Sequence, residues 1–84
     1  MQIDITQDHI DRGVRKSCTH CPIALAVQEK LGVDSVTVEQ EWIYPPDDEV
    51  RYFLPAAARD FISYFDWAGR SHVRPFSFEL FGET

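Results

Sequence analysis

Residues 18–32 read CTHCPIALAVQEKLG, and this stretch decides much of the fold. Pro22 suits the first turn of a helix, where a missing N–H loses no hydrogen bond. Gly32 suits the position just past a helix end. The apolar run 23–27 between them offers side chains for packing. The stretch therefore predicts a helix over about residues 20–31.

A second helix is predicted over residues 55–67, opened by Pro55 and ended by Gly69. Four apolar side chains recur at the spacing of one helix face, which we expect to pack on a sheet. They are Ala58, Phe61, Ile62 and Phe65.

The remaining elements are shorter. We expect strands at 2–6, 33–44, 50–54 and 73–81, a helical turn at 7–12 after Thr6, and a turn at 45–49. In the 33–44 strand, alternation places Val36, Val38, Trp42 and Tyr44 on one side. Trp42 and Tyr52 are then expected to share a face.

This order, β-α-α-β-β-α-β, predicts an α+β fold. We expect one small, mostly antiparallel sheet of about four strands, with two or three helices on one face. Its 84 residues suffice for a single domain over 1–84. The sequence has no apolar run long enough to cross a membrane and no signal-peptide pattern at its start. We therefore expect a cytoplasmic protein.

The charge of the chain is unevenly distributed. The formal net charge is −6, yet residues 1–33 carry four acids and four bases, and so do residues 51–84. The whole excess lies in residues 34–50, which hold six acids and no base. Such a segment should repel nucleic acid and attract a basic protein surface. The alternative is a hairpin that charge merely keeps soluble.

These charges and nearby aromatic side chains give a predicted partner-binding set. The acidic members are Glu39, Glu41, Asp47, Asp48 and Glu49, and the aromatic anchors are Trp42, Tyr44 and Trp67. Acidic and aromatic side chains together are typical of a protein interface. The oligomeric state stays open between a monomer and a homodimer.

Cys18 and Cys21 form a CxxC pair at the start of the first long helix. A structural zinc site could use both thiolates with His9 and one further ligand, although the spacing matches no complete zinc finger. A redox site is a second reading, but the polar residues 11–17 replace the buried strand that such sites require. The third reading is two reduced thiols that pack as small apolar groups, with no cofactor.

The runs HIDRGVR (9–15) and CTHCPIALA (18–26), with the tail from Val73 to Leu80, resemble a family of small, uncharacterised bacteriophage and bacterial proteins. The resemblance covers most of the chain, and its most specific part is CxxCPIALA. It implies a phage-type accessory protein that binds a host or defence protein.

The sequence contains no Gly-rich phosphate loop, HExxH or GxSxG pattern, so we expect no enzyme. We expect a small protein-binding or regulatory module, in its sharpest form an inhibitor that occupies the basic surface of a host or defence nucleoprotein. A metal- or thiol-dependent protein using Cys18 and Cys21, and a structural or assembly component, are the alternatives.

Overall fold

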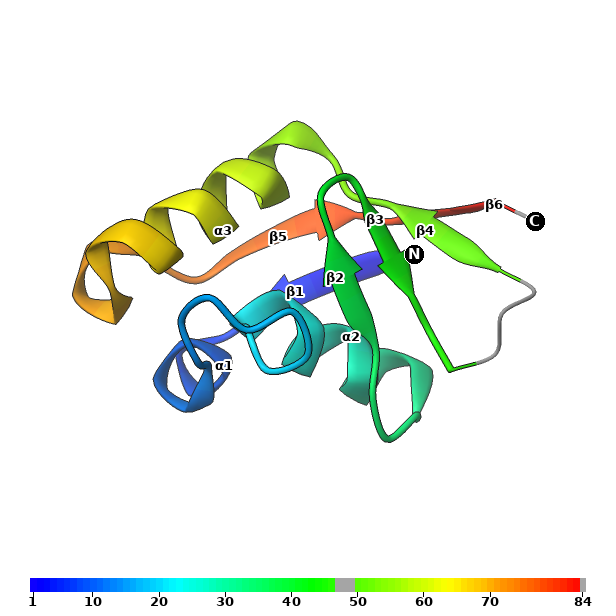
Figure 1. Ribbon diagram of the computed structural model, residues 1–84, viewed down its shortest axis with the longest axis horizontal. Coiled ribbons are helices and arrows are strands. Elements are labelled where there is room, and N and C mark those ends of the chain that lie inside the picture. The colour runs from blue at the N-terminus through cyan, green and yellow to red at the C-terminus, as the bar shows by residue number, and fades with distance from the viewer. Residues whose placement is uncertain (47–49, 84) are drawn as a thin grey trace.

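The computed structural model describes residues 1–46 and 50–83, and in these it places three α-helices, a 3₁₀ helix and six short strands (Figure 1). The elements are β1 (Gln2–Ile5), α1 (Gln7–Arg12), α2 (Pro22–Leu31), β2 (Thr37–Glu39), β3 (Trp42–Tyr44), β4 (Arg51–Phe53), α3 (Ala56–Ala68), η1 (Arg70–His72), β5 (Phe76–Glu79) and β6 (Phe81–Glu83). The α+β class is confirmed, and the order roughly matches the expected one.

Helix α2 is the central element. Cys21 caps its N-terminus, where Sγ accepts a hydrogen bond from the Ala24 N–H at 3.4 Å. Gly32 ends it with a φ of 68°, a left-handed conformation that glycine adopts without strain. Residues 22–27 are all buried, which is more than one full turn. The helix therefore packs on every side along its first half.

The other two α-helices follow the sequence signals closely. Thr6 caps α1 and accepts from the His9 N–H. Pro55 precedes α3, and Gly69 follows it with a φ of 93°. Ala58, Phe61 and Phe65 form the buried face of α3, as the spacing predicted.

The strands form two antiparallel sheets rather than one. β1 pairs with β5, and β2, β3, β4 and β6 form a four-stranded sheet in that order. The predicted strand 73–81 is thus divided at Leu80, whose N–H donates to the Met1 carbonyl at 2.8 Å. One C-terminal segment thereby joins both sheets.

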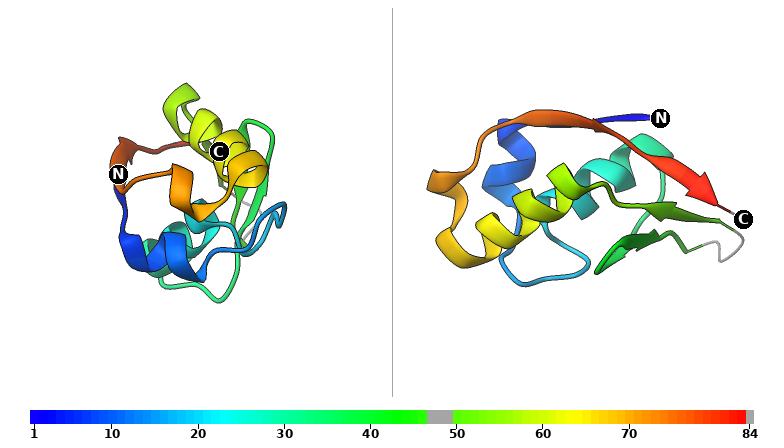
Figure 2. Two further views of the ribbon diagram at one scale, coloured as in Figure 1. Left: turned by 90° about the vertical axis from the view of Figure 1, so that its left-hand side faces the viewer. Right: turned by 90° about the horizontal axis from the view of Figure 1, so that it is seen from above.

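Helix α2 lies between these two sheets (Figures 1 and 2), in contact with β1 on one side and β2 on the other. One apolar cluster extends from the β1–β5 pair through α2 and α3 to the β2–β3 hairpin. Its largest fully buried members include Phe65, Ile3, Ile5, Ile10, Ile23, Ile43, Leu54 and Leu80. Among the described helices, none has the length and apolar character needed to cross a bilayer.

The predicted strand 33–44 is a tight hairpin. β2 and β3 pair with Glu39 opposite Trp42 and Val38 opposite Ile43. Gln40 takes a φ of 48° in the intervening turn. Because the chain reverses there, Val38 and Ile43 face the core while Trp42 faces outward, so the expected common side for Val38 and Trp42 was wrong.

The loop from residue 13 to residue 21 joins α1 to α2 and contacts α3 and β2 by hydrogen bonds. The Arg15 guanidinium donates to the carbonyls of Asp66 and Trp67, at the C-terminal end of α3. This places a cation where the helix dipole is negative. The Val38 N–H donates to the Cys18 carbonyl at 2.7 Å, so the loop covers the free edge of β2.

Candidate protein-binding surface

The outer face of the four-stranded sheet carries a row of aromatic side chains. Strand register aligns Glu39, Trp42, Phe53 and Phe81 side by side across all four strands. Phe53 is 36% exposed and Phe81 65% exposed, while Trp42 is half-buried. The Trp42 and Phe53 rings meet edge to face with centroids 5.5 Å apart. A stable sheet does not require such a row on its solvent side.

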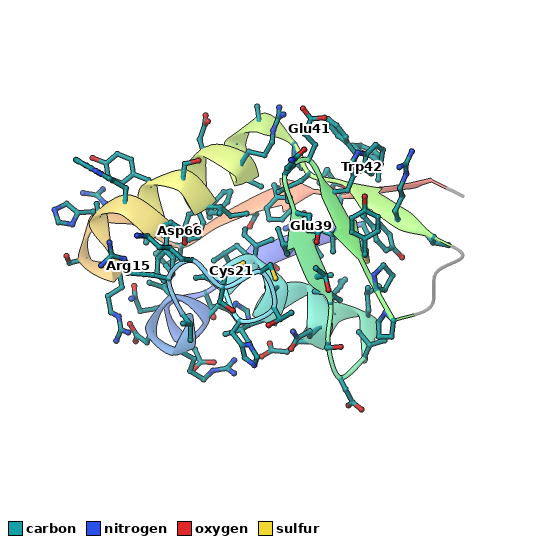
Figure 3. The ribbon with its side chains drawn as sticks, viewed as in Figure 1. Arg15, Cys21, Glu39, Glu41, Trp42 and Asp66 are labelled. Carbon is teal, nitrogen blue, oxygen red and sulfur yellow. The ribbon has the colours of Figure 1, made fainter. Side chains whose placement is uncertain are left out.

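Tyr44 lies two residues beyond Trp42 on β3, so its side chain leaves the same outer face. It is 37% exposed. An open hollow of about 390 Å³ is lined by Glu39, Gln40, Trp42 and Tyr44. Figure 3 shows Glu39, Glu41 and Trp42 together on the β2–β3 hairpin, which makes this hairpin the centre of the surface.

The charges at this surface are partly compensated within the chain. Glu41 forms a 3.0 Å ion pair with Arg59 of α3. The Arg51 guanidinium lies 3.8 Å from the centroid of the Trp42 ring. Glu39 is exposed and has no hydrogen bond or ion pair with any other residue that the structure describes. Of the predicted acids, Glu39 is therefore the one described carboxylate left available to a partner.

The structure brings together only part of the predicted set. Glu39, Glu41, Trp42 and Tyr44 lie on one hairpin, whereas Asp47, Asp48 and Glu49 lie outside the described residues. Trp67 is 78% exposed in the last turn of α3 and contacts Tyr64, with ring centroids 6.2 Å apart. That end of α3 points away from the sheet (Figure 1). Trp67 is thus a separate exposed aromatic group.

Two further surface residues, Phe53 and Phe81, were not predicted. Trp42 was expected to share its face with Tyr52, but Tyr52 lies opposite Ile43 on the inner side and Phe53 lies opposite Trp42. Alternation within Arg51–Phe53 could have indicated that Phe53 faces outward, and a strand break at Leu80 could have indicated the same for Phe81. The sequence predicts uninterrupted strands at 33–44 and 73–81, and this assumption gives the wrong register.

The two cysteines are free thiols with different environments. Cys18 is exposed and Cys21 is buried. Burial raises the pKa of the Cys21 thiol from 9.0 to about 11, and hydrogen bonds from backbone N–H groups only partly oppose this. A redox site at a helix start would need a lowered thiol pKa. For Cys21, desolvation outweighs the effect of the helix start, and the pKa is raised instead. Both residues line a cleft of about 620 Å³ beside Ser63 and Asp66 of α3.

His9 does not join the cysteines. Its Nδ1 accepts from the Thr6 N–H at 3.0 Å, and its Nε2 lies 2.8 Å from Glu29 Oε1. Since Nδ1 is an acceptor, Nε2 carries the proton and donates to Glu29. Hydrogen bonds from His9 and Arg12 lower the pKa of Glu29. Nδ1 thus helps to cap the N-terminus of α1, and Nε2 joins α1 to α2.

The structure therefore does not bring His9 together with Cys18 and Cys21. Zinc needs four ligands, and the set proposed from Cys18, Cys21 and His9 loses the imidazole. Within residues 1–46 and 50–83, no group of three or more His, Cys, Asp or Glu side chains is placed to hold a metal ion.

The chain matches no known family model, no curated protein and no solved structure.

Proposed function

We propose that this protein is a protein-binding module, and that the outer face of its four-stranded sheet receives a partner with a basic surface. The observation that carries the proposal is the exposed aromatic row Trp42–Phe53–Phe81 with Tyr44 beside it. Fully burying an exposed Phe side chain is worth about 1.5–3 kcal/mol, and Phe81, which is 65% exposed, could contribute most of that to binding. Exposed aromatic rings of this kind are the typical anchors of protein interfaces.

The charge of the chain supports the choice of partner. The net charge is −6, and the segment with the acidic excess, 34–50, contributes β2 and β3 to the proposed surface. Such a surface accelerates association with a basic partner and discourages direct contact with nucleic acid. We propose binding without catalysis and without a cofactor.

In its finer form, the proposal is a phage-type accessory protein acting in the host cytoplasm. It would occupy a basic surface on a host or defence nucleoprotein that otherwise holds nucleic acid. The acidic segment supports this form, because its carboxylates offer a partner negative charges like those of phosphates.

Capture experiments with paired variants test the proposal. The double variant F53S/F81S removes the two exposed rings of the row, and we expect it to lose the partner that the unchanged protein captures from its native host. W67S removes a more exposed ring elsewhere and should keep the partner. Equal capture by F53S/F81S and the unchanged protein would show that another surface binds.

A further inference from the structure

We infer that the hollow between Trp42 and Tyr44 is a binding site for an arginine side chain of the partner. The inference rests on the proposed function and makes it specific. It assigns a role to four neighbouring groups: two aromatic rings, the Glu39 carboxylate and the Gln40 amide, which line a space of about 390 Å³.

The placement of the two rings on one strand face suits a flat cation. Residues two apart in a strand lie roughly 6.6 Å apart along it, with side chains on the same face. The Arg51 guanidinium already lies 3.8 Å from the Trp42 centroid, which is the distance of a stacked cation. Both side chains line the same hollow, so one planar guanidinium placed there can contact Trp42 and Tyr44 together.

The Glu39 carboxylate favours a positively charged occupant. Glu39 is the cross-strand neighbour of Trp42 and is exposed. An apolar group in the hollow would cover this carboxylate without giving it a partner, which is unfavourable. A nucleobase could stack on the rings, but its phosphates would approach Glu39 and a chain of net charge −6.

The same groups favour arginine over lysine. A guanidinium can stack on an aromatic ring and donate two parallel hydrogen bonds to a carboxylate at the same time. An ammonium is a compact, strongly hydrated charge that does not stack in this way. Arg51 of this chain already stacks on Trp42 but does not line the hollow, so the space beside Glu39 and Tyr44 stays open to a guanidinium of the partner.

The probe is a blocked hexa-arginine peptide, titrated while the backbone amides of the protein are followed by NMR. Hexacitrulline is the matched control, because it keeps the planar shape and loses the charge. We expect shifts centred on β2 and β3, with affinity at least tenfold higher for hexa-arginine than for hexacitrulline. Hexalysine should bind several-fold more weakly than hexa-arginine.

Two variants locate the site, and each has a control elsewhere on the chain. E39Q keeps the size of the side chain, so it should fold normally and lower the affinity for hexa-arginine about fivefold. D60N removes one exposed carboxylate from α3 and should leave the affinity unchanged. W42L should lower it similarly to E39Q, and W67L should not.

Three results would overturn the inference: equal binding of hexacitrulline, equal binding of hexalysine, or equal losses for E39Q and D60N. Failure here is distinguishable from failure of the proposed function. If E39Q and W42L still capture the native partner while F53S/F81S does not, the sheet face binds proteins but the arginine site is wrong.

Discussion

The two sheets of this protein both have apolar inner faces, but their outer faces differ in polarity. On the β1–β5 pair, every outward side chain is polar: Gln2, Asp4, Ser77 and Glu79. On the four-stranded sheet, the outward row holds Trp42, Phe53 and Phe81. Since both sheets bury their other face in one apolar cluster, the fold alone does not demand the aromatic row. The difference points to recognition rather than to folding.

Hydrogen bonds reinforce this contrast. Asp4 Oδ1 accepts from the Ser77 hydroxyl at 2.6 Å and from the Gln2 amide at 2.8 Å. The amino group of Met1 lies 3.2 Å from Glu79 Oε2. The outer face of the β1–β5 pair thus satisfies its own polar groups. The aromatic face has instead an exposed carboxylate, Glu39, and rings that a partner could cover.

The largest expected effect separates the inner and outer faces of the four-stranded sheet. Ile43 is fully buried on the inner face, so I43A should lower the free energy of unfolding by about 2–4 kcal/mol. F81A removes a mostly exposed ring and should cost less than about 1 kcal/mol. Urea unfolding measures both. A comparable loss for F81A would mean that the row is structural, and the contrast between the sheets would disappear.

A second effect concerns the loop that covers the edge of β2. The Cys21 pKa is raised to about 11, so the folded state holds the proton more tightly than the unfolded state does. Stability should therefore fall as the pH rises from about 9 to about 11. The C21S variant keeps a side-chain oxygen that can cap α2. It should lose the part of the stability decrease between about pH 9 and pH 11 that comes from the Cys21 thiol. Thermal unfolding between pH 8 and pH 11 tests it.

Thiol alkylation of the folded protein gives an independent check on that loop. Exposed Cys18 should react with iodoacetamide, while buried Cys21 should stay unmodified until the protein unfolds. Mass spectrometry after proteolysis distinguishes the two positions. Rapid alkylation of Cys21 in the native state would contradict its burial and its raised pKa.

The smallest expected effect lies on the polar face. Hydrogen bonds from Ser77 and Gln2 lower the pKa of Asp4. A carboxyl whose pKa is lowered on folding stabilises the protein above its unfolded pKa, and the contribution is lost as the pH falls. D4N should therefore slightly flatten the acid side of the stability curve, while partner capture stays unchanged. If D4N abolished capture, the binding surface would include the β1–β5 pair.

Local sequence signals predicted the helices well. Thr6, Pro22, Gly32 and Gly69 mark helix ends because each meets a backbone requirement within a few residues of itself. The buried face of α3 followed from periodicity alone. Chemical type also gave part of the surface, since Glu39, Glu41, Trp42 and Tyr44 were chosen as charged and aromatic groups in one segment.

Strand register was harder to predict. The turn at Gln40 and Glu41 contains no Gly, Asn or Pro, so the sequence lacks the usual hairpin signal. A single misplaced turn reverses the face of every following side chain. That error paired Trp42 with Tyr52 instead of Phe53, and the undetected break of strand 73–81 at Leu80 left Phe81 out of the surface.

The amino-acid sequence by itself determined the α+β class, the positions of the helices and the acidic excess of residues 34–50, because these depend on composition and on neighbours in the chain. Only the tertiary structure decided that Glu39, Trp42, Phe53 and Phe81 form one outward row, that Arg59 neutralises Glu41, and that His9 pairs with Glu29 away from the cysteines. Those relations join residues far apart in the chain, and their pairing is set by packing the whole core, which no local pattern specifies.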